Sequence, residues 1–247
     1  MSHNPEKMRL DALLVSRGLF ESREKAQRAL MAGIVDVAGR RGGKPGDRVT
    51  VDIEIVVHGG EKYVSRGGLK LEAALQHFGV DPTGRVCLDV GASTGGFTDC
   101  LLQAGAARVH ALDVGHNQMH WKIRSDSRVV AREGINCRNL TSADIGDERV
   151  WLAVADVSFI SLTLIIPPAL ALLESGGSMI VLIKPQFELS RDAVGKGGIV
   201  SDPAAHAAAI EKIRTFVSES GHHFLGVIDS PILGTTGNRE FLAHIRP

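Results

Sequence analysis

The stretch CLDVGASTGGFTDCLLQAGAARVHALDVG, residues 87–115, has the order of a nucleotide-binding unit: an apolar strand, a glycine-rich turn, a helix and a second apolar strand. Asp113 ends the second strand roughly twenty residues after Gly91, the usual spacing between such a turn and a ribose-binding carboxylate. The turn reads Gly-Ala-Ser-Thr-Gly-Gly, so Ser93 stands where dinucleotide-binding turns have their middle glycine. Because that glycine admits the pyrophosphate, this turn favours a ligand without phosphate groups.

S-adenosylmethionine is such a ligand, and the turn favours it over NAD. Its amino-acid end and ribose would rest on the turn and the following helix N-terminus, with Asp113 accepting hydrogen bonds from the two ribose hydroxyls. The adenine is expected near residues 132–139, where Asn136 is the first choice and Glu133 an equal alternative. The residues expected to form this cofactor site are Asp89, Gly91, Ser93, Thr94, Gly95, Gly96, Phe97, Asp113 and Asn136.

Apolar runs that suit strands alternate with helical segments on both sides of this unit. Further strands are expected at 129–133, 151–157 and 178–184, and helices at 69–78, 161–173 and 202–220. This alternation predicts a doubly wound α/β fold, a parallel sheet with helices on both faces and a ligand beyond the carboxyl ends of its strands. Segments 222–230 and 239–246 are close enough in sequence to form a late antiparallel strand pair.

The composition sets the class of protein. The chain has 247 residues, 44% of them hydrophobic, and a formal net charge of zero, so a sizeable core is expected and a uniformly basic surface is not. Its N-terminus lacks a signal-peptide pattern, and its longest apolar stretch, 162–173, is short and contains two prolines. Three cysteines occur without a Cys-x-x-Cys motif. We therefore expect a reduced, cytoplasmic protein with buried thiols and no membrane partner.

Residues 8–57 differ in character and are expected to form a small separate α+β domain. Two short helices, with Leu10, Leu13, Leu14 and Leu19 inward on the first and Ala26, Leu30 and Met31 inward on the second, precede short strands. Ser22 is the expected N-cap of the second helix. Residues 58–64 are expected to be a linker and 65–247 the larger domain.

Basic side chains cluster in the small domain, on the second helix and on the turn after it. Such a cluster suits contacts to nucleic-acid phosphates, but a solvated helix face explains the charge equally well. The arrangement RLDALLVSRGL…MAGIVDVAG…KPGDRV closely resembles the alpha-L RNA-binding domain of a ribosomal protein, and this resemblance makes RNA the favoured partner. The candidate RNA-binding residues are Arg9, Arg23, Lys25, Arg28, Arg40, Arg41, Lys44 and, beyond the linker, Arg66.

Four charged residues lie where the larger domain should hold its ligand: Lys70, Asp156, Lys184 and Glu240. Asp156 and Lys184 each end an apolar run, so both need partners, and two structural ion pairs are the simplest explanation. In chain order, however, the four resemble the Lys-Asp-Lys-Glu tetrad of FtsJ-like ribose 2′-O-methyltransferases. With KYVSRGGLKL, ADVSFISL, IKPQFE and GNREF, nearly the whole chain resembles the TlyA family, historically also labelled haemolysins.

This resemblance implies a Rossmann-like methyltransferase sheet, S-adenosylmethionine as methyl donor, and the ribose 2′-hydroxyl of a ribosomal RNA cytidine, in 16S or 23S rRNA or in both, as acceptor. It also implies that the tetrad is catalytic. A lysine base must lose its proton, which burial or a nearby cation favours. We expect Lys184 to be the base, Lys70 to supply the nearby cation, and Asp156 and Glu240 to orient the two lysines. No metal is required.

Several other signals are weaker. His116 and His120 have a spacing that suits a metal site, but no third ligand is evident. Aromatic residues such as Tyr63, Phe97, Phe159 and Trp121 more often fill a core than stack on a base. The loop 187–202 is expected to close on RNA. A pore-forming haemolysin, an NAD-dependent oxidoreductase and a noncatalytic RNA-binding protein with a vestigial Rossmann domain are the alternatives, and the sequence does not indicate an oligomeric state.

Overall fold

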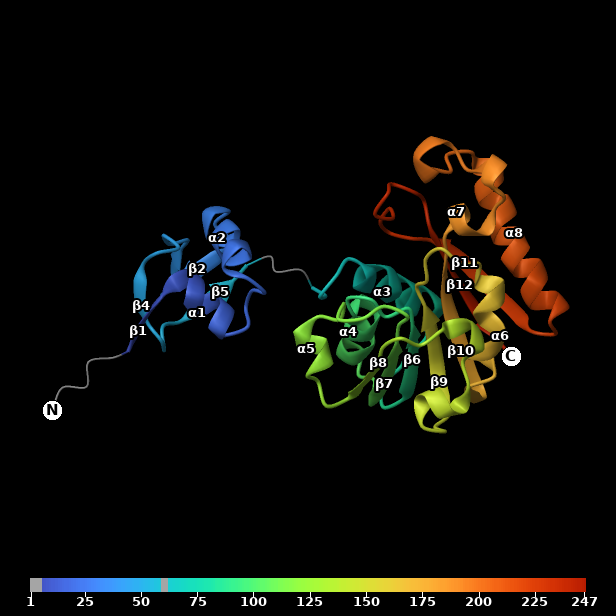
Figure 1. Ribbon diagram of the computed structural model, residues 1–247, viewed down its shortest axis with the longest axis horizontal. Helices are drawn as coiled ribbons and strands as arrows, with labels where there is room; N and C mark the ends of the chain where they lie inside the picture. Colours follow the sequence, from blue (N-terminus) through green and yellow to red (C-terminus); the bar gives the residue numbers. More distant parts are fainter. Residues whose placement is uncertain (1–5, 59–61) are drawn as a thin grey trace. The chain divides into compact units, whose positions relative to one another are not determined.

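The chain forms two compact units, Met1–Lys62 and Tyr63–Pro247, in a computed structural model that describes residues 6–58 and 62–247 (Figure 1). The first unit consists of β1 (Lys7–Arg9), α1 (Leu10–Ser16), α2 (Arg23–Met31), β2 (Val35–Val37), β3 (Arg40–Arg41), β4 (Arg48–Thr50) and β5 (Ile55–Val57). β1 pairs antiparallel with β4, and β2 pairs antiparallel with both β3 and β5.

The first unit has its own small core, in which residues of α1, α2 and β2 pack together, among them Leu10, Leu14 and Leu30. Ser22 caps α2, as expected, because its side chain accepts a hydrogen bond from the Lys25 amide. Two expected core residues are wrong. Leu19 is 40% exposed because α1 ends at Ser16, and Met31 is 77% exposed because it follows Leu30 on the last turn and points away.

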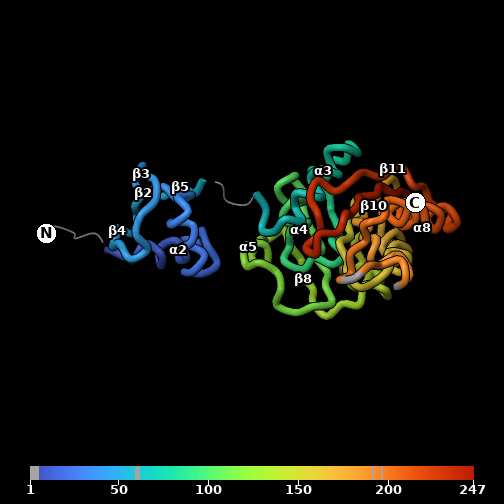
Figure 2. The backbone as a smooth tube through the Cα atoms, turned by 90° about the horizontal axis from the view of Figure 1, so that it is seen from above, coloured from blue at the N-terminus to red at the C-terminus, as the bar shows by residue number. Residues whose placement is uncertain are grey.

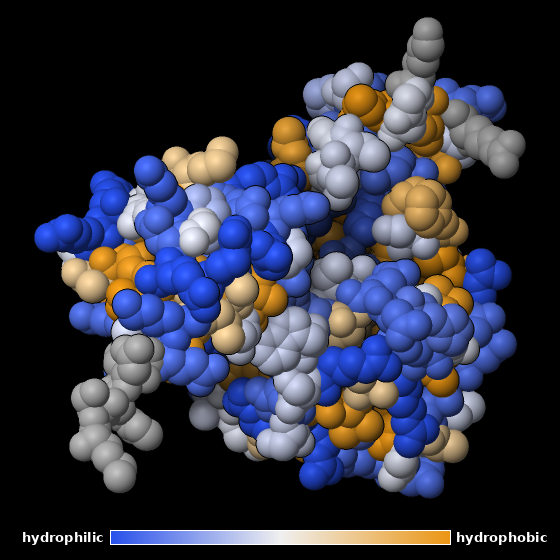
Figure 3. Space-filling view, turned by 60° about the vertical axis from the view of Figure 1, so that its left-hand side comes forward, coloured by the Kyte–Doolittle hydropathy of each residue, from blue (hydrophilic) through white to orange (hydrophobic). Residues whose placement is uncertain are grey.

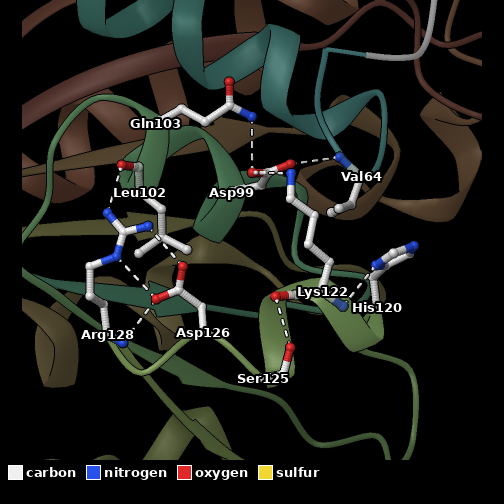
Figure 4. A network of polar contacts seen from close by, with 9 residues as sticks. All are labelled: Val64, Asp99, Leu102, Gln103, His120, Lys122, Ser125, Asp126 and Arg128. Carbon is white, nitrogen blue, oxygen red and sulfur yellow. Dashed lines mark hydrogen bonds and ion pairs between the residues drawn. The ribbon is translucent and has the colours of Figure 1, made fainter. Parts of the chain in front are cut away.

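The second unit begins with Tyr63, within the segment expected to be a linker; residues 59–61 of that segment lie outside the described chain. Tyr63 is buried, and Gly68 leaves room for its ring, with which a Cβ would collide. Figure 4 shows how the next residue is held: the Val64 amide donates to Asp99, which also accepts from Gln103 and lies 3.6 Å from Lys122. These contacts explain why the larger domain starts before residue 65.

The second unit is built around one seven-stranded sheet. Its strands are β6 (Val86–Val90), β7 (Arg108–Leu112), β8 (Val129–Arg132), β9 (Val150–Ala155), β10 (Leu173–Ile183), β11 (His223–Asp229) and β12 (Phe241–Arg246). Its α-helices are α3 (Gly67–Phe78), α4 (Gly96–Gln103), α5 (Trp121–Arg124), α6 (Ile166–Leu170), α7 (Pro185–Glu188) and α8 (Pro203–Glu219). Short 3-10 turns occur at η1 (Cys137–Asn139), η2 (Ser142–Ile145), η3 (Leu162–Leu164), η4 (Arg191–Ala193) and η5 (Lys196–Gly198).

The strand order is β11-β12-β10-β9-β6-β7-β8. The five strands from β10 to β8 are parallel, whereas β12 runs antiparallel to both of its neighbours. This confirms the doubly wound sheet with a late antiparallel pair; Figures 1 and 2 show that pair next to α8. From β6 the chain runs outward to β7 and β8 and then returns to β9 on the other side of β6. The carboxyl ends of β6 and β9 therefore flank the topological switch point, where ligands of such sheets bind.

Helices cover both faces of the sheet, so its central strands are buried on each side. Residues of α3 and α4 form one core with Ile180 and Leu182 of β10, and residues of α6 and α8 form the other with Val181 and Ile183. The helix expected at 161–173 is wrong in extent. It is broken into η3 and the short α6, and β10 already begins at Leu173, because Pro167 and Pro168 do not continue a regular hydrogen-bonded helix.

Cys87, Cys100 and Cys137 are all buried in the second unit. On the face shown in Figure 3, hydrophobic residues lie in small separate patches among hydrophilic ones. Within residues 6–58 and 62–247, no helix has the length and apolar character needed to cross a membrane.

Candidate active site

The glycine turn after β6 touches the end of β9 directly. The Asp156 amide donates to the carbonyl of Val90 over 3.1 Å, and a Cβ on Gly91 would lie 2.7 Å from the carbonyl oxygen of Asp156. Gly91 also has φ +82°, in the region that glycine adopts without strain. A glycine is thus required here for two reasons, and it brings the turn and Asp156 to the same point of the sheet edge.

Asp113 fastens the turn to the end of β7. One carboxylate oxygen accepts the Ser93 amide over 2.7 Å, and the other accepts the Gly115 amide over 2.6 Å. Ser93 itself has φ +46°, a conformation that is costly for a residue with a side chain and is held here by that contact. Since a carboxylate offers about four lone-pair positions, Asp113 retains capacity for further donors.

Asp89, in β6, is fully buried. Its Oδ2 accepts the hydroxyl of Thr98 over 2.6 Å, and its Oδ1 has no hydrogen-bond partner among the described residues. Burial raises the pKa of Asp89 to about 7, with Asp156 and Asp113 adding smaller repulsions, although the Thr98 bond opposes the rise. The side chain therefore lies beneath the turn and titrates near neutral pH.

Two adjoining cavities open at this edge of the sheet. The larger, of about 490 Å³, is lined by Gly91, Ser93, Asp113 and Asn136 of the expected cofactor set, together with residues 157–160. The smaller, of about 150 Å³, shares Gly91 and Ser93 and adds Gly96, Phe97 and Lys184. Both are lined by Asp156 and Ser158, so the two cavities meet beside Asp156.

Three other expected cofactor residues line neither of these cavities: Asp89 and Gly95 are buried, and Thr94 is exposed. The alternative to Asn136, Glu133, forms an ion pair with Arg124 at 3.0 Å and accepts the Asn117 amide. Asn136 caps η1 by accepting the Arg138 amide and lines the larger cavity. Of the two candidates for the adenine, only Asn136 therefore borders the larger cavity.

The four charged residues form two ion pairs. The Nζ atom of Lys70, on α3, lies 2.6 Å from Glu240 Oε2, and both side chains are buried. The Nζ atom of Lys184, which follows β10, lies 2.6 Å from Asp156 Oδ1 and donates to Ser158 Oγ over 2.9 Å. Of the two pairs, the second has both of its members in the lining of the smaller cavity, whereas neither Lys70 nor Glu240 lines either of the two cavities described above.

Glycine also shapes the first pair. A Cβ on Gly234 would collide with the carboxylate of Glu240, so the 230–238 segment packs against this side chain only because residue 234 has none. The segment is held from α3, where the Arg66 guanidinium donates to the Leu233 carbonyl over 2.7 Å. Arg66, expected to contact RNA, has this internal role in the structure and is also exposed.

Phe159 was expected to fill a core, and this expectation is wrong. Its side chain is 88% exposed, and its backbone has φ +64°, an unusual conformation for a bulky residue. Its ring lies 5.1 Å from that of Phe187 and borders the larger cavity. Tyr63 and Phe97 are buried, as expected, and Trp121 is half exposed. The exposure of Phe159 depends on this backbone conformation, which no local sequence pattern indicates.

In the first unit, a buried carboxylate holds two of the candidate RNA-binding arginines. Asp11 accepts Nε and Nη2 of Arg9 over 3.1 and 2.9 Å, and it also accepts Arg23 and Gln27. The hydrogen bonds from Arg9 hold the pKa of Asp11 far below its usual value, although burial opposes this. Lys25 pairs with Glu21, and Arg41 donates to the Gly33 carbonyl.

The remaining RNA-binding candidates of that unit are available for a partner. Arg28, Arg40 and Lys44 are exposed, and within residues 6–58 their side chains have no hydrogen-bond or ion-pair partner.

The histidine pair considered for a metal site does not form one with a third ligand. His120 accepts the Lys122 amide through Nδ1, and the described chain contains no cluster of three or more His, Cys, Asp or Glu side chains arranged to hold an ion.

Comparison with known proteins agrees with this geometry. The FtsJ-like methyltransferase family matches residues 63–246, and the S4 domain matches residues 8–55. A Bacillus subtilis protein, YqxC, is 50% identical over 97% of this chain and 86% of its own. The 16S/23S rRNA (cytidine-2′-O)-methyltransferase TlyA of Mycobacterium tuberculosis is 43% identical over 96% of this chain and 89% of its own.

Relatives with another name show the same similarity. Hemolysin A of Brachyspira hyodysenteriae is 44% identical over 96% of this chain and 99% of its own. A solved structure from Streptococcus thermophilus, provisionally described as a hemolysin, superimposes with a TM-score of 0.73 at 45% identity, covering 97% of this chain and 88% of that one. The family models match both domains, and the sheet has its antiparallel strand β12 next to β10. The chain therefore belongs to the FtsJ-like methyltransferase family, with an S4 domain ahead of the methyltransferase domain.

Proposed function

We propose that this protein transfers the methyl group of S-adenosylmethionine to the ribose 2′-hydroxyl of cytidine in ribosomal RNA, acting on ribosomal RNA or ribosomal subunits in the cytoplasm. The observation that carries the proposal is the meeting of two cavities beside Asp156, one bordered by Asp113 and the other by Lys184. A cofactor site and a charged reaction site therefore share one wall. The M. tuberculosis relative, named for cytidine 2′-O-methylation of 16S and 23S rRNA, supports the choice of substrate.

The larger cavity suits S-adenosylmethionine in size and in the chemistry of its walls, since ligand pockets commonly enclose about 300–1,000 Å³. Asp113 accepts from the ribose hydroxyls, while Gly91 and Ser93 present the turn to the amino-acid end. Asn136 and residues 157–160 border the place left for the adenine. When bound, S-adenosylmethionine supplies an electrophilic methyl group on a sulfonium.

Lys184 is the residue that we propose acts on the nucleophile. Asp156 and Ser158 hold its ammonium at the junction of the cavities, where the 2′-hydroxyl must lie to meet the methyl group. To accept the hydroxyl proton, Lys184 must first be neutral. Methyl transfer is therefore expected to accelerate as the pH rises. Lys70 and Glu240, a buried pair, would orient the site and stabilise the charge that develops on the ribose oxygen.

RNA contacts are proposed at two places. In the S4 domain, Arg28, Arg40 and Lys44 have unengaged guanidinium or ammonium groups that suit phosphates, whereas Arg9 and Arg23 are preoriented by Asp11. At the mouth of the larger cavity, the exposed ring of Phe159 offers a surface on which an unpaired base can stack.

The test is transfer of labelled methyl groups to isolated 16S and 23S rRNA and to ribosomal subunits, followed by mapping of 2′-O-methylcytidine. We expect incorporation at ribose of cytidine that requires S-adenosylmethionine and is lost in Lys184→Met. Incorporation into bases, or binding of RNA without any transfer, would contradict the proposal; the second result would support the noncatalytic alternative.

A further inference from the structure

Glu188, at the end of α7, is a buried carboxylate that the proposed chemistry does not use. Its side chain is 1% exposed, and it accepts hydrogen bonds from two other parts of the chain, residues 161–162 and Lys212. Oε1 accepts the Leu162 amide over 2.8 Å; Oε2 accepts the Ser161 hydroxyl over 2.6 Å and lies 3.1 Å from the Lys212 ammonium. We call Glu188, Ser161, Leu162 and Lys212 the Glu188 cluster.

The Glu188 cluster connects the two segments that carry the second ion pair of the site. α7 begins immediately after Lys184, so Glu188 fixes the short helix that Lys184 precedes. Ser161 and Leu162 end the segment that starts at Asp156 and includes Ser158, the two residues in contact with the Lys184 ammonium. Lys212 joins both to α8 and also donates to the Glu188 carbonyl over 2.6 Å. The segments that carry Lys184 and Asp156 are thus joined at two places, once by this ion pair and once by the Glu188 cluster.

Backbone strain in the same segment points to a positioning role. Phe159, two residues before Ser161, has φ +64°, and such conformations persist only where surrounding contacts hold them. The hydrogen bonds that Ser161 and Leu162 donate to Glu188 hold the chain on one side of Phe159, and the bond from Lys184 to Ser158 holds it on the other. They also keep Phe159 beside Phe187, which is in α7 next to Glu188. Apolar side chains would fill this interior space at less cost than a buried charge, so stability alone does not explain the carboxylate.

We infer that Glu188 is a positioning residue for methyl transfer: by binding Ser161, Leu162 and Lys212 it sets Asp156 and Ser158 against Lys184 and fixes the mouth of the cavity. This inference rests on the proposed function. Loss of the carboxylate should slow the chemical step by about 10- to 100-fold, because small displacements of reacting groups have effects of that size. Binding of S-adenosylmethionine and RNA should change much less.

The experiment compares Glu188→Gln with Glu148→Gln in the full chain. Glu148 is the control, since it too joins separate segments by accepting from Arg108 and His110; its side chain is 31% exposed, and it precedes β9 at the opposite edge of the sheet. Single-turnover methyl transfer at saturating S-adenosylmethionine and rRNA, the two dissociation constants and Tm are measured for each. We expect a lower Tm in both variants, but a slower saturated rate only in Glu188→Gln, with restoration of at least part of that rate in Glu188→Asp.

Three outcomes decide the question. A Glu188→Gln variant that is destabilised like Glu148→Gln yet transfers methyl groups at the wild-type rate overturns the inference, while the proposed function stands. A wild-type protein that transfers no methyl group overturns the proposed function and this inference with it. If Glu188→Gln does not fold, Lys212→Gln takes its place, because the Lys212 side chain is 41% exposed and binds Glu188. A saturated rate equal to that of the wild type in Lys212→Gln would also overturn the inference.

Discussion

Replacing either active-site lysine by methionine separates a chemical role from a structural one. Methionine keeps an apolar stem and removes the ammonium, so each variant leaves one carboxylate without its partner. In Lys70→Met the orphaned group is Glu240, whose side chain is 4% exposed. In Lys184→Met it is Asp156, whose side chain is 22% exposed and lines both cavities, although its Oδ1 atom, which binds Lys184, is buried.

The two stability losses should therefore differ. Breaking a buried pair costs about 3–5 kcal/mol, whereas a pair accessible to water contributes about 1 kcal/mol or less. In a unit the size of residues 63–247, a loss of 1 kcal/mol in the free energy of unfolding lowers Tm by about 2–4 °C. We expect Lys70→Met to lower Tm by roughly 6–20 °C and Lys184→Met, whose orphaned carboxylate is less buried, by less than Lys70→Met.

For methyl transfer we expect the opposite order, with the larger loss in Lys184→Met and the smaller loss in Lys70→Met. Lys184→Met should reduce single-turnover methyl transfer by about 10²- to 10⁴-fold, the usual range for a general base, with S-adenosylmethionine affinity unchanged. Lys70→Met should retain slow transfer, because Lys184 keeps its contacts with Asp156 and Ser158. Calorimetry, titration with S-adenosylmethionine and rates across pH are measured on the same preparations. If Lys184→Met instead loses stability and cofactor affinity while keeping its rate, the pairs are structural clamps; if Lys70→Met is inactive and Lys184→Met active, the roles are reversed.

Three further changes test other parts of the site. Asp113→Ala should weaken S-adenosylmethionine binding by about 1.5–3 kcal/mol through loss of charged acceptors, and unchanged affinity in calorimetric titration of a folded variant would contradict that assignment. Asp89→Asn tests burial of a carboxyl group whose pKa rises from 3.8 to about 7. As the pH rises between these values, the folded wild type holds its proton while the unfolded chain loses it, so the free energy of unfolding of the wild type should fall relative to that of the variant, by at most ~4 kcal/mol. Parallel curves of stability against pH, measured by urea unfolding, would contradict this expectation. Combined replacement of Arg28, Arg40 and Lys44 by alanine should reduce the slope of log affinity for RNA against log salt by about 2–3, leaving cofactor affinity as it was, and an unaltered slope would exclude them as phosphate contacts.

Much of the fold follows from local patterns in the sequence. Apolar runs alternating with amphipathic segments predict the doubly wound sheet, and the short separation of 222–230 from 239–246 predicts the antiparallel pair that the structure contains. The errors arise where tertiary packing overrides a local pattern. Leu19 and Met31 have the spacing of core residues, but they fall beyond or at the last turn of their helices. The apolar run from 161 to 173 looks helical, but its two prolines divide it and the strand β10 takes its end.

The site is harder to predict, because its geometry depends on pairing between distant segments. The tetrad was expected from its resemblance to a family pattern, but only the coordinates show that Lys70 pairs with Glu240 and Lys184 with Asp156. No spacing rule indicates that Glu188 binds a segment 26 residues before it. Exposure of Phe159 is similarly invisible in sequence, since it depends on one left-handed backbone conformation in the loop.

The burial of all three cysteines has a practical consequence for labelling. Thiolates, not thiols, attack maleimides, and burial raises the pKa of Cys87 to about 12 and that of Cys137 to about 11, while Cys100 is also inaccessible. The native protein should therefore be almost unreactive toward such probes at neutral pH. A cysteine introduced at exposed Met31 in the S4 domain and another at exposed Leu225 on β11 would be the reactive sites, so donor and acceptor dyes placed there can follow the distance between the two domains as ribosomal RNA binds.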